Sequence, residues 1–334
     1  MQLTAPFQHR KPILKSKGGW LAIAGALGLA GTAAYVAYAA RRAEEKFPPS
    51  GEFIDVDGVR LHYLMKGEGY PTILLLHGNG SMASDFEGSG LFGALAAHHK
   101  VIAIDRPGFG YSERPRGKKW DAIEQARLIA AATQRLAIGK MLVVGHSSGT
   151  QCAMALALEA PHLVSQLVLM SGYYYPTSRI EAAIQGMNGL PIIGNALCYT
   201  ASALSARFML DKFTKRVFAP QQVPQRFLDH APRDLMLRPS QMRANGEESL
   251  MMNKDAARLS ERYADIPHPI TLLAGDEDGA LSTADQSAKL HEALPNSKLK
   301  VIERAGHMLH YAAPLVVIAA IEEAAKNGKG STNH

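Results

Sequence analysis

Cysteine is nearly absent from this sequence, and its scarcity excludes several classes of protein. Two cysteines in 334 residues are too few for a disulfide-rich scaffold, or for a zinc or iron–sulfur domain built from several cysteines. Extremes of composition are missing as well, because hydrophobic residues make up 47% of the chain and charged residues 20%. These proportions are those of an ordinary globular protein, and they exclude a disordered chain, a coiled coil and a collagen-like fibre.

An excess of charge is missing from most of the chain. The formal net charge is +6, which by itself would be compatible with a nucleic-acid-binding protein. Residues 1–46 contain seven basic and two acidic side chains, whereas the remaining 288 residues contain 29 basic and 28 acidic ones. Because the larger part is close to neutral, we predict no nucleic-acid partner and look for another reason for the basic N-terminus.

Charge is missing altogether between Lys17 and Arg41. The stretch Trp20–Ala40 has 21 residues, WLAIAGALGLAGTAAYVAYAA. At about 1.5 Å per residue, a helix of this length spans roughly 30 Å, the thickness of the hydrocarbon core of a bilayer. Aromatic residues lie near both ends of the stretch, as they do at membrane interfaces. The pattern predicts an uncleaved, membrane-anchoring helix at residues 20–40.

Two other interpretations of the apolar stretch stay open. A cleaved signal peptide would use Ala37-Tyr38-Ala39 as its small-x-small cleavage site and would leave a secreted or periplasmic protein. A soluble protein would instead bury the stretch as a core helix. For an uncleaved anchor, the basic residues and the amino terminus before the stretch outnumber the basic residues after it. The positive-inside rule then places the large domain of a single-pass protein on the non-cytoplasmic side.

The rest of the chain predicts one α/β domain. Residues 1–19 form a basic leader, residues 41–52 a linker, residues 53–326 the domain and residues 327–334 a flexible tail. Within the domain, Asp57-Gly58 predicts a hairpin turn, and apolar runs then alternate with helical patterns. Such alternation is typical of a mostly parallel sheet with helices on both faces. The predicted strands are 72–76, 101–104, 141–144, 164–170, 270–274 and 299–302, and the predicted helices are 122–136, 152–160, 283–294 and 314–326.

One region interrupts the alternation. From about residue 176 to residue 263 the sequence has no clear buried-strand run and is rich in methionine, proline, alanine and arginine, which predicts short helices inserted between two strands. An insertion at the carboxyl edge of a parallel sheet is typical of a cap. Most of its apolar side chains are expected to pack as a core under the cap, and the rest favour an apolar acyl or alkyl group in the substrate. Tyr173 and Tyr174, at the preceding strand end, are predicted to line the pocket.

A nucleophile motif lies where a predicted strand meets a helix. The segment Gly145-His146-Ser147-Ser148-Gly149 fits G-x-S-x-G, and the tight turn of this motif exposes its central side chain at the N-terminus of a helix. We therefore predict that Ser147 is the nucleophile. Ser148 competes with it but is off-centre in the motif, and its backbone N–H is predicted to be one donor of the oxyanion hole.

A serine nucleophile needs a base, and the base needs an acid that orients it. Among 13 histidines, His307 follows the last predicted strand in a glycine-led loop, and His310 is its rival three residues further on. The segment GDED after the strand 270–274 offers Asp276, Glu277 and Asp278 as the acid. The chain order serine, acid, histidine is the one that a mostly parallel sheet with this turn requires.

The loop after the strand 72–76 is the expected source of a second oxyanion donor. It reads His77-Gly78-Asn79-Gly80, and its glycines permit a turn that aims the Asn79 N–H at the nucleophile, with help from the Asn79 side chain. The alternative is a glycine-rich turn without a catalytic role. No spacing of histidine, cysteine and aspartate suggests a metal, and the triad needs none, so we predict no metal and no cofactor.

Five motifs resemble, in their residues and in their order along the chain, those of the α/β-hydrolase family. The resemblance is specifically to its serine-nucleophile esterase, haloperoxidase-like and epoxide-hydrolase-like branch. The resemblance covers about Phe53 to Lys326. It implies that the acid lies three residues after the strand-end glycine, which favours Asp278 over Asp276. It also implies His307 as the base, and for Asp105 a role in organising a loop. The motifs are HGNG (77–80), DRPGFGYS (105–112), GHSSG (145–149), GDED (275–278) and GHMLHYAAP (306–314).

The resemblance also narrows the reaction. Epoxide hydrolases and haloalkane dehalogenases of this fold use an aspartate nucleophile, whereas this chain has Ser147. The expected function is hydrolysis of an ester or related acyl bond through an acyl-enzyme intermediate, with a small, apolar, ester-like substrate. Two alternatives remain: a catalytically silent hydrolase-fold protein that binds or scaffolds a partner, and a cofactor-free haloperoxidase (perhydrolase) activity.

Overall fold

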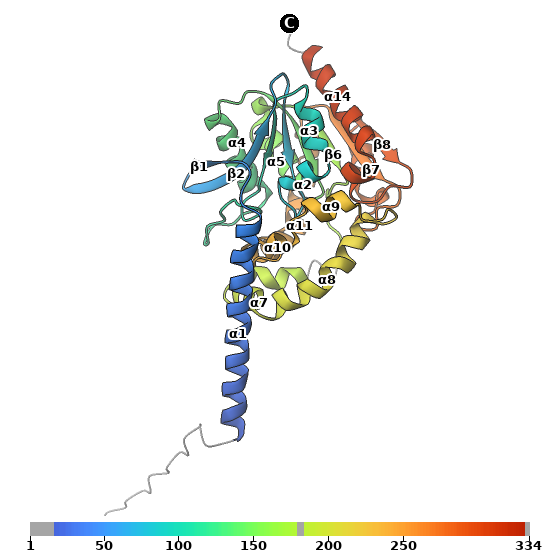
Figure 1. Cartoon of the computed structure of the whole chain (residues 1–334). Coiled ribbons are helices and arrows are strands. Elements are labelled where there is room, and N and C mark those ends of the chain that lie inside the picture. Colours follow the sequence, from blue (N-terminus) through green and yellow to red (C-terminus); the bar gives the residue numbers. More distant parts are fainter. Residues whose placement is uncertain (1–16, 179–183, 331–334) are drawn as a thin grey trace, which may run out of the picture.

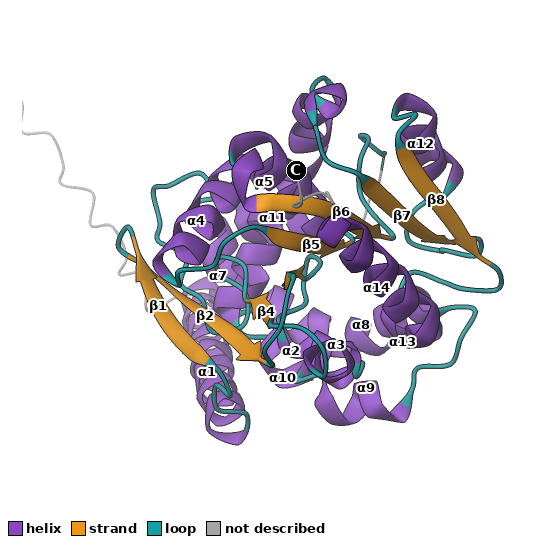
Figure 2. Cartoon of the chain, turned by 90° about the horizontal axis from the view of Figure 1, so that it is seen from above, coloured by secondary structure: helices purple, strands orange, loops and turns teal. Residues whose placement is uncertain are grey.

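A central β-sheet organises the molecule. A computed structural model describes residues 17–178 and 184–330, and in these residues eight strands form one sheet in the order β1-β2-β4-β3-β5-β6-β7-β8 (Figures 1 and 2). The β1–β2 and β2–β4 pairs are antiparallel, and all other pairs are parallel, which confirms the predicted fold. The strands are β1 Glu52–Val56, β2 Val59–Lys66, β3 Thr72–Leu76, β4 Val101–Ile104, β5 Met141–His146, β6 Val164–Met170, β7 Ile270–Gly275 and β8 Ser297–Ile302.

The β1–β2 hairpin turns at the predicted dipeptide. Val56 pairs with Val59, so only Asp57 and Gly58 form the turn. Their φ angles are 51° and 77°, and two consecutive positive φ angles are what a type I′ turn requires. Of the predicted leader 1–19 and tail 327–334, residues 1–16 and 331–334 lie outside the described residues.

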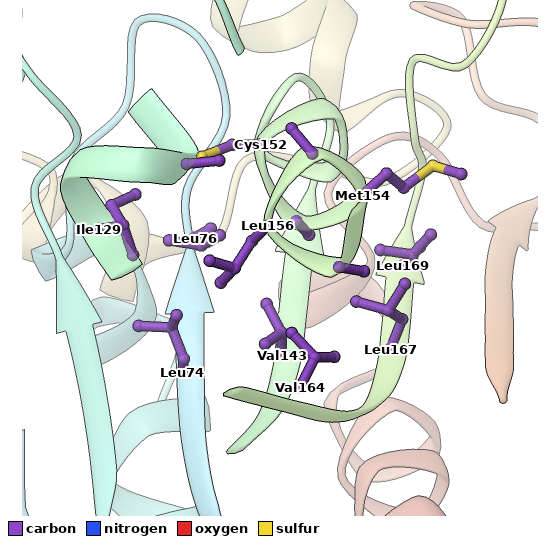
Figure 3. Packing of buried hydrophobic residues seen from close by; sticks show 14 of the residues in the cluster. Leu74, Leu76, Ile129, Val143, Cys152, Met154, Leu156, Val164, Leu167 and Leu169 are labelled. Carbon is purple, nitrogen blue, oxygen red and sulfur yellow. The ribbon is translucent and has the colours of Figure 1, made fainter. Parts of the chain in front are cut away.

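Helices cover both faces of the sheet. Successive strand residues point to opposite faces, so Leu74 and Leu76 belong to one buried cluster and Ile73 and Leu75 to the other. The first cluster packs under α4 (Ala122–Arg135) and α5 (Gly149–Glu159), as the close view in Figure 3 shows for Ile129, Cys152, Met154 and Leu156. The second packs under α2 (Ser84–Gly88), α3 (Leu91–Ala96) and α14 (Pro314–Gly330).

The described part of the segment between β6 and β7 is helical wherever it has regular structure. Two of its helices, α8 and α11, have 18 and 22 residues and are longer than the short helices that the sequence predicts. In α11 the glycine at 246 is a packing requirement, because a Cβ there would lie 2.5 Å from the backbone N of Gly189. The helices are α7 Ile193–Tyr199, α8 Ala201–Phe218, α9 Gln225–His230, α10 Arg233–Met236 and α11 Pro239–Ser260.

One long helix, α1 (Lys17–Lys46), projects from the domain (Figure 1). It is long and apolar enough to cross a membrane, with a mean hydropathy of 1.6, although a signal sequence would pass the same test. Only 6% of its apolar window is buried, which argues against a buried core helix. Its C-terminal half does contact the domain, because Val36 is 3% and Ala43 is 2% exposed.

Candidate active site

The turn between β5 and α5 holds Ser147 in a strained conformation. Its φ is 53°, in the left-handed region that a non-glycine residue rarely adopts, and its N–H donates to Met170 O at 3.0 Å. A Cβ on Gly145 would lie 2.9 Å from Thr150 Cα, and one on Gly149 would lie 2.3 Å from Leu76 O. Glycine is therefore required at both positions. The Ser147 side chain is half-buried, whereas the residues on either side of it in the sequence are buried.

The loops after β7 and β8 bring Asp278 and His307 together. Asp278 Oδ2 lies 2.8 Å from His307 Nδ1, while Asp278 Oδ1 accepts from the N–H groups of Ala280 and Leu281 at 2.8 and 2.9 Å. Burial alone would raise the pKa of Asp278, but His307 and these N–H groups outweigh it and lower that pKa. Asp276 is exposed and accepts only from the Ala305 N–H.

The side chains of Ser147 and His307 form no direct hydrogen bond in this structure, but the loops that carry them are in contact. His146, next to Ser147 in sequence, links the two loops: its Nε2 lies 3.1 Å from His307 O, and the two imidazole rings are 5.0 Å apart. From the other side, a Cβ on Gly78 would touch Ser147 Cβ at 3.0 Å. Catalytic hydrogen bonds are often long before a substrate binds, so the arrangement is compatible with a serine–histidine pair.

Several backbone N–H groups beside Ser147, among them those of Asn79 and Ser148, are left without an acceptor in the described residues. Across the described residues, the N–H groups of Asn79 and Ser148 donate to no protein atom. Unpaired N–H groups at a helix N-terminus are suited to bind an oxyanion. The Asn79 side chain, in contrast, is turned towards α11, where its Nδ2 donates to Ser249 Oγ at 3.1 Å and Asn245 O at 3.4 Å. Only the backbone of Asn79 is therefore available for the oxyanion role.

His310, the rival base, belongs to a different pair. Its Nε2 lies 3.0 Å from Asp85 Oδ2, and both side chains are buried. Tyr311 also donates to Asp85 Oδ1, at 3.1 Å. Burial would raise the pKa of Asp85, but His310 and the other donors outweigh it and lower that pKa. The structure thus separates the two histidines that the sequence left in competition.

A buried ion pair that sequence reasoning missed lies directly behind Ser148. Arg106 contacts Glu248 of α11 at 2.7 and 2.9 Å, and its remaining donors go to His77 O, Gln125 Oε1 and Ser148 Oγ. Ser148 Oγ donates in turn to Glu248 at 2.6 Å. Burial would raise the pKa of Glu248, but Arg106 outweighs it and lowers that pKa. Arg106 lies within the motif DRPGFGYS (105–112), whereas no sequence pattern singles out Glu248 as a functional residue.

The remaining predicted residues are buried in structural contacts. Tyr173 OH donates to Asn253 Oδ1 of α11 at 2.6 Å, and its N–H bonds Thr150, which in turn bonds Ser147 O. Tyr174 is fully buried in the first core cluster, and its role in lining a pocket stays a prediction. Asp105 accepts from the N–H groups of Ala83 and Tyr111, which is the loop-organising role that the resemblance implies.

The two cysteines and the metal-binding residue types add no further site. Cys152 and Cys198 are free and buried, and burial raises the pKa of Cys152 to about 12 and of Cys198 to about 11. Within residues 17–178 and 184–330, no group of three or more His, Cys, Asp or Glu side chains is placed to hold a metal ion. The chemistry of the site therefore has to be argued from Ser147, His307 and Asp278.

Comparison with known families decides the fold family. Residues 71–314 match the model of the alpha/beta hydrolase fold. The chain belongs to the α/β-hydrolase fold family. A 2-hydroxymuconate semialdehyde hydrolase from Pseudomonas putida is 29% identical over 276 residues, which cover 79% of this chain and 90% of that hydrolase. Together with the family, this similarity supports hydrolase activity for this α/β-hydrolase.

Solved structures agree with the family assignment. A thermophilic esterase from Thermogutta terrifontis superposes with a TM-score of 0.67 at 20% identity, over 83% of this chain and 99% of the esterase. A membrane phospholipase A superposes with a TM-score of 0.60 at 21% identity, over 93% of this chain and 96% of the phospholipase. At these identities the two structures establish the fold alone.

Proposed function

We propose that this hydrolase cleaves carboxylic esters through Ser147, His307 and Asp278. The observation that carries the proposal is the position of a strained serine at a helix N-terminus beside two free N–H groups and a buried histidine–aspartate pair. Each part supplies one requirement of acyl transfer: a nucleophile, an oxyanion site, and an oriented base.

The reaction proceeds in two halves. Ser147 Oγ attacks the ester carbonyl while His307 Nε2 takes its proton, and the N–H groups of Asn79 and Ser148 stabilise the oxyanion that forms. The alcohol leaves with the proton from His307, and the acyl group stays on Ser147. Water then attacks the acyl-enzyme with His307 as the base, which releases the acid. Asp278 holds the His307 tautomer that keeps Nε2 free to accept, and its lowered pKa keeps it ionised.

The buried cation that contacts Ser148 is not available to bind an anionic substrate. Arg106 is the buried cation that contacts Ser148, and all of its N–H donors are used by protein groups. An anionic substrate such as a muconate, which the relative from Pseudomonas putida takes by name, would need a cation that is free to bind it. A neutral ester with an apolar acyl group has no such need.

We also propose that α1 is an uncleaved anchor and that the domain lies on the non-cytoplasmic side. Its exposed apolar length supports a membrane span, and the larger number of basic residues before the apolar stretch supports this orientation. The contacts of Val36 and Ala43 with the domain also support retention of α1, because cleavage after Ala39 would remove Val36.

Hydrolysis of p-nitrophenyl esters by the purified full chain tests the proposal. We expect Ser147→Ala to lower kcat/KM by at least about 10³-fold, because the nucleophile is lost. Ser148→Ala keeps the backbone N–H and should retain most of the activity, so it is the matched control. Absence of hydrolysis by the wild type would favour the silent binding protein, and faster turnover of a carboxylate-bearing muconate-type substrate would contradict the ester assignment.

A further inference from the structure

The helices α7 and α8 carry apolar side chains on an outer surface that nothing in the described chain covers. We call this surface the outer cap face. Phe208 and Ile192 are each 84% exposed, far more than a large apolar side chain in water normally is. The face consists of Ile192, Ile193, Leu204, Phe208, Met209 and Phe213.

Helix α8 is apolar on opposite sides. Its buried residues Ala203, Thr214 and Phe218 lie within one narrow sector of the helix at 100° per residue. Phe208 and Met209 lie well outside this sector, more than 100° from its centre. The outer side of α8 therefore carries large apolar side chains, Phe208 and Met209, that no described residue covers.

The position of α1 indicates what covers the outer cap face. Val36 of α1 packs against Cys198 of α7 and Ala203 of α8, and the Arg207 guanidinium lies 5.6 Å from the centre of the Tyr35 ring. Val36 precedes the end of the apolar stretch, Ala40, by four residues, or about 6 Å of helix. If α1 spans a bilayer, α7 and α8 therefore lie at the depth where interfacial helices insert their apolar side, about 5–10 Å.

The charges of α8 fit a lipid surface better than a protein surface. Lys212 and Lys215 are exposed among the apolar residues of the helix. Lysine is depleted in protein–protein interfaces, whereas at a membrane its long stem reaches up to the headgroups and its charge attracts anionic lipids. Figure 1 shows that α7 and α8 lie at the end of the domain from which α1 projects.

We infer that the outer cap face inserts into the surface of the bilayer that α1 spans. The inference rests on the proposed anchor, and it goes beyond the proposed esterase activity. The domain is then held at two places, by α1 and by α7–α8, so the cap sits in the lipid rather than above it. An ester that partitions into the bilayer reaches the cap without passing through water, which makes membrane lipids and lipid-soluble esters the favoured substrate class.

Quenching of tryptophan by brominated lipids tests the insertion. The full chain is placed in phosphatidylcholine–phosphatidylglycerol vesicles with brominated acyl chains, in a Trp20→Phe background that removes the tryptophan of α1. We expect the emission added by Phe208→Trp to be quenched. The matched control is Leu315→Trp, because Leu315 is 79% exposed but lies on α14, outside the outer cap face. Its emission should be unaffected by bromine.

Two results would overturn the inference. One is a protein that stays in the vesicles while Phe208→Trp is quenched no more than Leu315→Trp. The other is an unquenched Phe208→Trp whose emission shifts to shorter wavelength as the protein-to-lipid ratio rises, because a second copy of the chain would then cover the face. Neither result depends on catalysis, so the proposed function stands or fails separately.

Activity supplies a second readout. The double variant Phe208→Ser/Met209→Ser should hydrolyse a long-chain ester embedded in vesicles roughly tenfold more slowly, because two apolar anchors are lost. Its hydrolysis of a soluble short-chain ester should stay unchanged, and Leu315→Ser should change neither rate. Equal losses on both esters would contradict lipid insertion, since they would indicate damage to the fold.

Discussion

The surroundings of Ser147 and the outer cap face differ in how their groups find partners. Beside Ser147, Arg106 and Glu248 are buried, and their polar atoms are matched by protein atoms, which leaves the nucleophile and two N–H groups free for a substrate. On the outer cap face, large apolar side chains such as Phe208 are not covered by any residue in 17–178 or 184–330. If both proposals hold, the protein supplies every group of its catalytic site itself, whereas the outer cap face needs a partner outside the described chain.

The largest effect is expected at the acid of the proposed triad. Asp278→Asn should lower kcat by about 10³–10⁴-fold, because the amide no longer favours the His307 tautomer that leaves Nε2 as a base. Asp276→Asn is the matched control, and its kcat should change by less than about twofold, since Asp276 is exposed and bonds only a backbone N–H. Ester kinetics measure both. A larger loss of kcat in Asp276→Asn than in Asp278→Asn would show that Asp276, and not Asp278, is the acid of the triad.

Removal of the Glu248 charge tests whether the buried Arg106–Glu248 ion pair holds α11 against the core of the domain. Glu248→Gln leaves the Arg106 charge buried without its counter-charge, which should lower the free energy of unfolding by about 2–4 kcal/mol. Chemical denaturation of the full chain in detergent measures it. Glu323→Gln is the control, because Glu323 pairs with Lys298 on the surface and its loss should leave stability unchanged within error. Equal stability of both variants would show that Arg106 and Glu248 do not couple α11 to the core.

A smaller effect, with a defined pH dependence, is expected at Asp255 of α11. Burial raises the pKa of this side chain to about 6, although it accepts from the Ala122 N–H and lies near Arg258; Asp121 and Glu248 add to the increase. The folded state thus binds the proton more tightly than the unfolded state. The corresponding stability is present below the unfolded pKa of about 4 and is lost as the pH rises through 6.

Replacement of Asp255 by asparagine should therefore stabilise the protein at high pH. At pH 8, Asp255→Asn keeps an acceptor for Ala122 and removes a buried charge, so the free energy of unfolding should rise by roughly 1–3 kcal/mol. The gain should shrink as the pH falls from about 6 to about 4. Denaturation at several pH values measures it, and a gain that is the same at pH 4 and pH 8 would contradict burial of the charge.

Features with local causes could be predicted from the sequence. The strands 72–76 and 101–104 have the predicted bounds, because continuous runs of apolar residues are typical of strands in a sheet that is covered on both faces. Ser147 could be placed at the β5–α5 turn because its motif encodes the turn itself. The pairing of His307 with Asp278 rather than Asp276 needed the family's spacing, since the residues alone left both acids open.

Features that depend on distant contacts could not be predicted. Arg106 and Glu248 are 142 residues apart, and nothing in either segment indicates the other. The apolar pattern of α1 predicts a membrane span but not the packing of Val36 against α7 and α8. The side chain of Asn79 points at α11 because α11 passes over it, a fact of tertiary structure.

Mapping of a covalent adduct tests the central claim, that Ser147 is the nucleophile of a serine hydrolase. The full chain is treated with a fluorophosphonate, and the tryptic peptide 141–179 is sequenced by mass spectrometry. We expect the phosphonate on Ser147, no adduct in Ser147→Ala, and unimpaired labelling of Ser147 in Ser148→Ala. An adduct on Ser148, or labelling that persists in Ser147→Ala, would contradict the claim.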